Sequence, residues 1–309
     1  MPRIAACQSV ETTILLFLLL LMFLAGCRPS EPPEEKTASR ETSPIPAPLP
    51  PATPEPGSPE AGSNPPAPDN TNQLPLPTSK GGEEHLVFAE KKRPRVALII
   101  DDMGYHRQLG CQLLQLDLNL TYSFLPDAPY TGEQAAMAFQ SGRDILVHLP
   151  MEPKDAAWNP GADALTVQDS PECIREKMAR MLAAVPHAVG ANNHMGSRFT
   201  EDAGLMQVVI ESLKNRSYFF VDSYTTAASQ GLPTARQLGV PSARLQVFLD
   251  TVQEPQRICR QVERLIAGAK KQGEAIGIGH PNRAMLAALT QCGEQFREVE
   301  IVGAHWLVQ

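Results

Sequence analysis

Between residues 93 and 309 the sequence predicts an α/β fold, a distorted β/α barrel of about seven strands. Short, continuous apolar runs recur there, as in strands that are buried on both faces. Between these runs, apolar residues follow one another at helical spacing. Six of the runs are followed by Asp, Asn or His, five of them directly and the sixth after one glycine. Strands that alternate with helices imply a mainly parallel sheet. We favour a compact β/α barrel over the alternative, an open, doubly wound sheet.

The N-terminus has the features of an export signal with a lipid anchor. Arg3 precedes the apolar run Ile14–Ala25, which is too short for a membrane span of roughly 20 residues and suits a signal peptide. The run ends in Leu-Ala-Gly-Cys, which resembles the bacterial lipobox, where the cysteine is lipidated. We therefore expect residues 1–27 to be a lipoprotein signal peptide with lipidated Cys27. An uncleaved anchor helix is the alternative.

The residue after the lipidated cysteine bears on localisation. It is Arg28 rather than Asp, which by resemblance to Gram-negative sorting rules favours the periplasmic face of the outer membrane. We expect an exported protein that is lipid-anchored in the cell envelope and contacts the membrane through that anchor.

Residues 28–92 are expected to form a disordered, proline-rich tether. More than half of the 29 prolines precede Arg93, and the sparse apolar residues show no period. Such a segment cannot bury enough surface to offset its conformational entropy. Its prolines favour extended polyproline structure, which would let an anchored domain reach away from the membrane. A proline-rich ligand for a partner protein is the alternative.

The third expected segment, residues 93–309, is the folded domain. Its predicted strands are Val96–Ile100, Leu120–Phe124, Asp144–Val147, Ala188–Ala191, Tyr218–Val221, Leu245–Leu249, Ala275–Ile278 and Val299–Val302. Three predicted helices carry apolar stripes that begin at Ile174, Leu205 and Ile258. Seven or eight such units fit a compact barrel.

Charge and cysteine content narrow the possible functions. The formal net charge is −7, so we expect no nucleic-acid partner, because such a partner usually requires a basic face.

The folded domain contains four cysteines, Cys111, Cys173, Cys259 and Cys292. Export permits disulfides, and four cysteines allow three pairings. None belongs to a Cys-x-x-Cys pair, which argues against a thiolate zinc site, and we favour free, buried thiols.

Polar residues follow six of the eight predicted strands, at the point where each of the six ends. They are Asp101 and Asp102, His148, Asn192 to His194, Asp222, Asp250 and His280. In a β/α barrel the carboxyl ends of the strands meet at one mouth, where active sites lie. These residues therefore predict one polar pocket. A polar residue at a strand end can instead cap the next helix, and we favour that interpretation for Asp250.

The residue types in this pocket suit metal-assisted hydrolysis. Two His and one Asp are a common ligand set for a catalytic zinc ion, which keeps one position open for water. Such an ion polarises a carbonyl and lowers the pKa of water, while a carboxylate accepts a proton and a His protonates the leaving group. Asp101 and Asp102 are adjacent, and side-chain alternation sends them in different directions. One could bind metal while the other acts as base.

Five short motifs carry a family resemblance. In order, they are Ile99–Gly104, His148–Pro153, Asn192–Ser197, Phe220–Ser223 and Gly277–Pro281. The set resembles the divergent branch of the polysaccharide deacetylases, over about residues 95–309. The resemblance implies a distorted β/α barrel and metal-dependent removal of acetyl groups from N-acetylated or O-acetylated sugars.

The resemblance assigns roles to three residues and leaves the second motif altered. It implies that Asp101 is the catalytic base, Asp102 a metal ligand and His280 the general acid. Typical members place two metal-binding histidines four residues apart on one loop, and this sequence has no such pair. We expect His148 and His194, on separate strand ends, to converge on one divalent ion, with zinc as the expected metal.

Three further residues complete the expected site. The Arg-Pro-Tyr-like third motif of the family is absent as such. Arg198 either orients Asp101 or holds substrate, or else it forms a surface ion pair. Asn193 and Asp222 are expected to bind substrate or to orient other groups, with helix capping as the alternative for Asp222.

Three functions are compatible with these residues. The first is a metal-dependent deacetylase that acts on envelope or extracellular polysaccharide, with acetylated polysaccharide or peptidoglycan as its partner. The second, suggested by the altered second motif, is a non-catalytic glycan-binding or scaffold protein that keeps the fold. The third is a hydrolase of a different bond, such as a peptide amide, in the same pocket.

Overall fold

The computed structural model describes residues 93–161 and 163–309. The expected signal peptide, Cys27 and tether all lie outside these residues. Among the described helices, none is both long enough and apolar enough to cross a membrane. The strands are β1 (Arg95–Met103), β2 (Thr121–Phe124), β3 (Ile145–Met151), β4 (Gly190–Met195), β5 (Phe219–Asp222), β6 (Ser242–Arg244), β7 (Val247–Phe248), β8 (Glu274–Gly279) and β9 (Glu300–Ile301).

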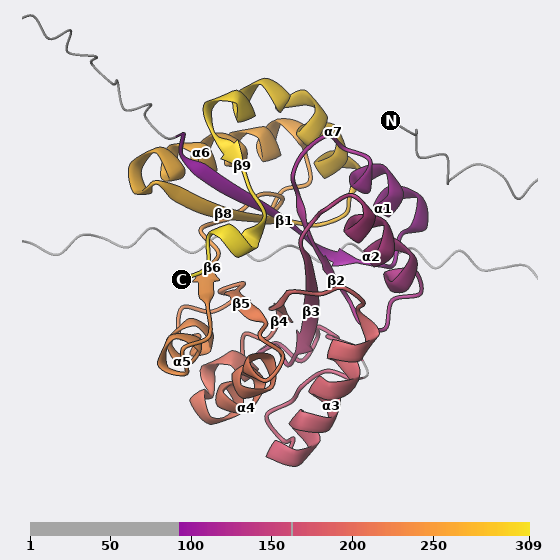
Figure 1. The fold of residues 1–309 in the computed structure, drawn as a ribbon, viewed down its shortest axis with the longest axis vertical. Coiled ribbons are helices and arrows are strands. Elements are labelled where there is room, and N and C mark those ends of the chain that lie inside the picture. Colours follow the sequence, from indigo (N-terminus) through magenta and orange to yellow (C-terminus); the bar gives the residue numbers. More distant parts are fainter. Residues whose placement is uncertain (1–92, 162) are drawn as a thin grey trace, which may run out of the picture. The chain divides into compact units, whose positions relative to one another are not determined.

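Seven α-helices surround the sheet in the described part of the chain (Figure 1). They are α1 (Arg107–Leu114), α2 (Thr131–Gln140), α3 (Pro171–Ala184), α4 (Ala203–Lys214), α5 (Gly231–Gln237), α6 (Pro255–Gln272) and α7 (Arg283–Gln291). Several begin where a side chain caps the first turn, as Asp202 accepts from two backbone N–H groups at the start of α4. The predicted stripe at Ile174, Met178, Met181 and Leu182 is the buried face of α3.

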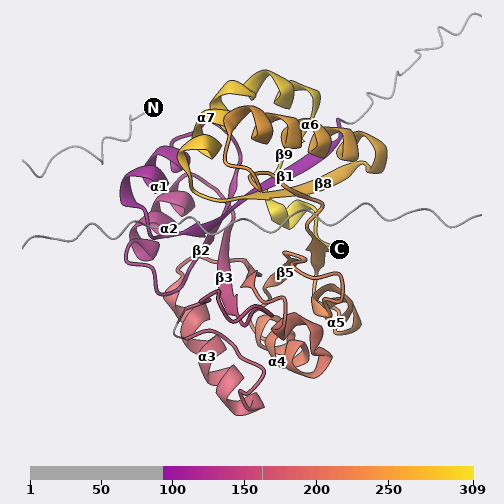
Figure 2. The same cartoon turned by 180° about the vertical axis from the view of Figure 1, so that it is seen from behind.

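The strand order confirms a barrel rather than a doubly wound sheet. All the ladders are parallel, and the order is β6-β5-β4-β3-β2-β1-β8-β7, with β9 beside β1. Read around a circle, this is the order of the sequence, whereas a doubly wound sheet reverses its order at a switch point. Figure 2, seen from behind, shows the same ring of helices outside the strands.

The barrel is distorted at one seam. In the described part of the sheet β6 and β7 are the two ends of the strand order, and the chain itself crosses between them. The N–H of Leu245 donates to Asp222 of β5, and the N–H of Gln246 donates to Ile276 of β8, at 2.9 and 3.0 Å. The predicted strand Leu245–Leu249 is therefore shorter than expected, and the polar strand β6 before it has no apolar run that could have revealed it.

Alternate residues of β1 face two different apolar layers. Val96, Leu98 and Ile100 pack in the large core that includes the helices, whereas Ala97 and Ile99 face the inside of the curled sheet. The C-terminal segment fills that inner space with Val302, Ala304 and Leu307. The side-chain period of two therefore decides which residues near a strand end can reach the mouth.

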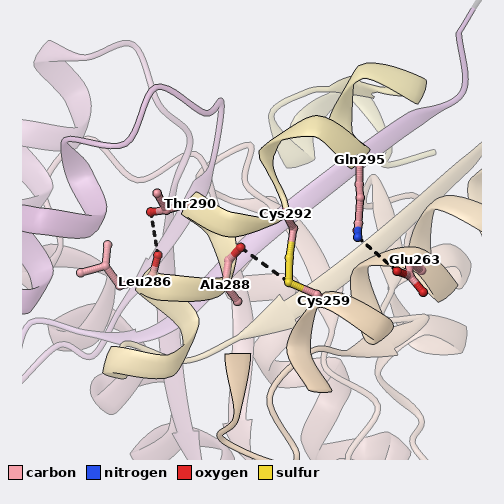
Figure 3. Close-up of a disulfide and its surroundings, with 7 residues drawn as sticks. All are labelled: Cys259, Glu263, Leu286, Ala288, Thr290, Cys292 and Gln295. Atoms are coloured by element: carbon pink, nitrogen blue, oxygen red, sulfur yellow. Dashed lines mark hydrogen bonds between the residues drawn. A yellow bond between two sulfur atoms is a disulfide. The ribbon is translucent and has the colours of Figure 1, made fainter. Parts of the chain in front are cut away.

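A disulfide joins Cys259 in α6 to Cys292 at the end of α7 (Figure 3). Its Cα atoms are 5.8 Å apart. Our expectation of free thiols is therefore wrong for this pair. The sequence could not reveal the pairing, because it depends on how α6 and α7 pack together. Cys173, by contrast, contributes its thiol to a hydrogen bond with Asp169.

We expect the disulfide to stabilise the fold, because it closes a loop between residues 33 positions apart. Replacing Cys259 and Cys292 together by Ser should lower the free energy of unfolding by about 2–4 kcal/mol, measured by denaturant titration. A Cys173→Ser variant is the control, because serine can keep the hydrogen bond to Asp169. Equal midpoints for the double variant and the wild type would contradict this prediction.

Candidate metal centre

Two adjacent carboxylates reach the mouth because β1 departs from regular geometry. Asp101 lies two residues after Ile99, whose side chain faces the inside of the sheet, so the side chain of Asp101 faces inward as well. Asp102 would then face the helices with Ile100, but its φ of 53° is left-handed and the β1–β2 register shifts between Ile100 and Met103. A bulge of this kind re-aims a side chain. Asp is among the few residues that tolerate this conformation.

Three side chains from three strands meet at the mouth. Asp102 Oδ1 lies 3.1 Å from His148 Nε2 and 2.8 Å from His194 Nδ1. The two imidazole nitrogens are 3.2 Å apart. Bonds of about 2.0–2.2 Å to a tetrahedral zinc ion would place its ligand atoms about 3.4 Å from one another. The expected ligands on β1, β3 and β4 thus converge as the sequence analysis predicted.

The chemistry of these atoms fits a divalent ion. Asp102 Oδ1 is buried, yet it has no hydrogen-bond partner at acceptable angles, despite its two imidazole neighbours. A carboxylate oxygen and two imidazole nitrogens that all lie within 4.8 Å of one another form a donor set of the kind that holds a zinc ion. Burial alone would raise the pKa of Asp102, but His148 and His194 outweigh it and hold that pKa below its usual range. The carboxylate is therefore ionised and ready to bind metal.

The buried amide of Asn192, to which the sequence analysis gave no separate role, fixes two of these groups. Asn192 Nδ2 donates to Asp101 Oδ1 at 2.8 Å, and Asn192 Oδ1 accepts from Ser123. His148 Nδ1 is 2.8 Å from the same Asn192 oxygen, so this nitrogen carries the proton. His148 Nε2 is left with a lone pair for metal, as in metal-binding histidines whose other ring nitrogen donates to a fixed acceptor.

Asp101 is the second carboxylate of the pocket. Its side chain is almost fully buried, and its Oδ2 lies 3.7 Å from His148 Nε2. Burial raises the pKa of Asp101, against the opposing effect of His148 and His280. The group therefore combines a position beside the metal ligands with a raised affinity for a proton, as a general base requires.

His280 forms a dyad with Asp250. The Nδ1 of His280 lies 3.0 Å from Asp250 Oδ1, and the backbone N–H of His280 donates to Asp250 Oδ2. Asn282 donates to the same oxygen. Burial lowers the pKa of His280, but the hydrogen bond and charge of Asp250 outweigh it and raise the pKa to about 9. Asp250 thus belongs to the site, whereas we had favoured a helix cap.

The structure brings Asn193 to the pocket and leaves two other expected residues outside it. Asn193 accepts from the backbone N–H of Ser223 and donates to Met195, which holds the β4 and β5 ends together. Asp222 has the outward parity of Phe220, and its carboxylate accepts from Ser229 and the N–H of Leu232, at the start of α5. Asp222 therefore does not have the orienting role in the pocket that we expected, and its contacts match the alternative, capping of a helix.

Arg198 also lies away from Asp101. Its guanidinium pairs with Glu152 at 2.9 Å and is half exposed. The surface ion pair was the alternative interpretation of this residue. Asn192, rather than an arginine, contacts the Asp101 carboxylate. The signal that could have found Asn192 was its place beside Asn193 and His194 at a predicted strand end.

Comparisons with known proteins agree with this geometry. Residues 98–308 match the family described as divergent polysaccharide deacetylase. The chain belongs to this family. It is 35% identical over 201 residues to the uncharacterised protein YibQ of Escherichia coli (strain K12), covering 64% of the chain and 61% of that relative. It is also 35% identical over 208 residues to an uncharacterised protein of Haemophilus influenzae, covering 65% of the chain and 71% of that protein.

A solved structure shares the fold of this divergent polysaccharide deacetylase domain. It is the crystal structure of an uncharacterised protein from Agrobacterium tumefaciens C58, with a TM-score of 0.67 and 24% sequence identity. The likeness covers 72% of this chain and 92% of that one. At this identity the likeness shows the barrel alone.

We expect the full chain to bind about one equivalent of a divalent ion, because one donor set is present among the described residues. Changing His148 and His194 together to Ala should abolish binding, measured by mass spectrometry of the bound metal. His305→Ala is the matched control, since His305 also pairs with an aspartate, Asp144. Retention of metal by the double variant, or its loss in the control, would contradict this ligand set.

Proposed function

We propose that this protein is a metal-dependent hydrolase that removes acetyl groups from a polysaccharide of the cell envelope or the extracellular space. The observation that carries the proposal is the convergence of Asp102, His148 and His194 beside a second, buried carboxylate. Family membership supports the same reaction class. The match covers 61% of the length of the Escherichia coli relative. We therefore base the proposed activity on the site of this chain and not on that relative.

Asp102, His148 and His194 are the residues that would hold the ion, with zinc as the proposed metal. Their hard oxygen and borderline nitrogen donors suit zinc. When bound, such an ion supplies positive charge that polarises an acyl carbonyl and favours ionisation of water. The chain contributes the orientation of the ligands, since Asn192 fixes the tautomer of His148.

Asp101 is proposed as the general base. Its carboxylate lies beside His148, and Asn192 holds one of its oxygens, which leaves the other free to face substrate. In the reaction this oxygen would accept the proton of the attacking water. Because burial raises the pKa of Asp101, the carboxylate takes a proton more readily than an exposed aspartate would.

His280 is proposed as the general acid. Asp250 holds its Nδ1, which leaves Nε2 to give a proton to the departing sugar nitrogen or oxygen. A histidine with a pKa of about 9 is protonated at neutral pH, as an acid must be before the step. The product pair is acetate and the free amine or hydroxyl of the sugar.

We further propose that the domain works outside the cytoplasm, anchored through Cys27 and carried on the tether of residues 28–92. The apolar run and Leu-Ala-Gly-Cys string support export. The disulfide between Cys259 and Cys292 supports it as well, because such bonds persist in oxidising compartments. An envelope address would bring the domain to acetylated polysaccharide or peptidoglycan.

The Asp101→Asn variant tests the reaction. We expect acetate release from N-acetylated and O-acetylated oligosaccharides to fall by about 10²–10⁴-fold, while bound metal stays unchanged, because the amide cannot accept the proton. Enzymatic measurement of acetate checks the first outcome and metal analysis the second. Metal binding with no acetate released from any glycan would favour a non-catalytic glycan-binding protein, and cleavage of a peptide amide instead would identify a different hydrolase.

The Asp250→Asn variant tests the dyad. In metal-free protein we expect His280 to titrate near pH 9, and at a lower pH in the variant, because the hydrogen bond and charge that raise its pKa are weakened. The pKa of His280 is higher in the folded protein than the value of about 6.5 expected for the unfolded chain. The pairing of His280 with Asp250 therefore stabilises the fold fully below about pH 6.5, and this stabilisation is lost as the pH rises through about 9. The measurement is an NMR titration of the imidazole. An unchanged titration would refute the proposed role of Asp250.

A further inference from the structure

A hollow of about 360 Å³ lies at the end of the barrel opposite the candidate metal centre. Ser242 and Glu274, the first residues of β6 and β8, both line it, so it lies at the amino ends of these strands. Figure 1 shows the C-terminal end of the chain beside β6, where the backbone of Gln309 exchanges two hydrogen bonds with Ser242. The hollow therefore lies at the seam, where β6 and β8 do not pair with each other.

A buried hydroxyl in this seam hollow has no hydrogen-bond partner. Ser242 is only 1% exposed, and its Oγ forms no hydrogen bond within the part of the chain that the structure describes. A buried polar group without a partner destabilises a fold, and for this reason most such groups are paired. A ligand in the hollow that accepts a hydrogen bond from Ser242 Oγ would remove this cost.

Two guanidinium groups line the same hollow. Arg244 lies two residues after Ser242 in β6, so the two side chains share one face of the strand. Arg236 comes from α5, which packs against β6. Among the described residues, neither arginine has a carboxylate partner. Arg244 lies over the ring of Tyr224, 4.4 Å from its centroid, and this stacking orients the guanidinium and leaves its N–H groups for a ligand.

The nearby carboxylates are matched by other groups. Glu274, which also lines the hollow, accepts from Arg95 at 2.8 Å. Asp222 is level with Arg244 in the β5–β6 ladder, but its carboxylate accepts from Ser229. The two arginines of the hollow therefore give it an excess of positive charge.

We propose that the seam hollow binds a small phosphate ester, whose phosphate oxygens accept from Ser242, Arg236 and Arg244. The guanidinium fork matches the geometry of phosphate oxygens, and hydrogen bonds to an anion are stronger than those between neutral groups. The volume of about 360 Å³ falls in the range of about 300–1,000 Å³ that small-molecule sites occupy. It leaves room for a carbon substituent against Leu232 and Leu307, which complete the lining. None of these residues lies at the mouth, so the binding is independent of the proposed reaction.

The test is calorimetric titration of the full-length protein at low salt with glycerol phosphate and with inorganic phosphate. Both should bind, the ester more tightly because its glycerol contacts the two leucines. Ser242→Ala, Arg236→Ala and Arg244→Ala should each weaken binding by about tenfold, the value of one hydrogen bond to a charged group. Arg216→Ala is the matched control, because Arg216 is an exposed arginine that shortly precedes β5, at the same end of the barrel, and does not line the hollow.

Unfolding temperatures separate loss of binding from loss of folding. Ser242→Ala removes a hydroxyl that has no partner, so its midpoint without ligand should equal or exceed that of the wild type. Glycerol phosphate should raise the midpoint of the wild type and of Arg216→Ala, and should raise that of Ser242→Ala less. Equal affinity in Ser242→Ala and the wild type, or an equal loss in Arg216→Ala, would overturn the proposed site.

Further titrations identify the source of the phosphate and its place. Dihexanoylphosphatidylglycerol, used below its micelle concentration, carries the same ester in a lipid headgroup. Tighter binding of this lipid than of glycerol phosphate, weakened by Arg244→Ala, would identify a lipid ligand, and weaker binding would identify a soluble ester. Phosphate binding that survives all three substitutions and disappears when the metal is chelated would place the anion at the metal centre and reject the seam site.

Discussion

Two carboxylates and two imidazoles share a space to which little water has access, and their electrostatics governs the rest of the site. Asp101 and His148 are almost fully buried, and Asp102 and His194 are at most partly exposed. Charged groups in such a place need partners, because burial otherwise disfavours the charged form. The opposite directions in which the pKa values of Asp101 and Asp102 move reflect this competition. Asp102, which has two imidazole neighbours, stays ionised. The raised pKa of Asp101 gives it the higher proton affinity that a general base needs.

The pairing of β3 with β4 explains how the two histidines can converge although the second motif is altered. Where typical family members would use one loop for both histidines, this chain uses the β3–β4 ladder, in which His148 is level with Asn192 and His194 is level with Pro150. Ladder register, rather than loop conformation, fixes the distance between the two imidazoles. The same register places Asn192 beside His148, so one pair of strands supplies two of the candidate ligands and the group that orients one of them.

The two ends of the barrel interior are filled by different kinds of side chain. At the amino end the C-terminal segment fills the interior with the apolar side chains of Val302, Ala304 and Leu307. At the carboxyl end the inward positions are occupied by Asp101, His148, Asn192 and His280. The disulfide ties α6 to α7, the helices that flank β8 in sequence, and so supports the strand after which His280 follows.

The sequence by itself determined the barrel, its parallel strands and the polar set at their ends, because apolar runs and helical stripes are local patterns that follow directly from burial. It also indicated Asp102, His148 and His194 as partners. Only the tertiary structure decided the rest. Asp222 faces α5 and Arg198 faces Glu152, since parity and packing, not residue type, set their direction. Asn192, Asp250 and the Cys259–Cys292 bond acquire their roles from residues distant in the chain, and such contacts leave no periodic signal in a single sequence.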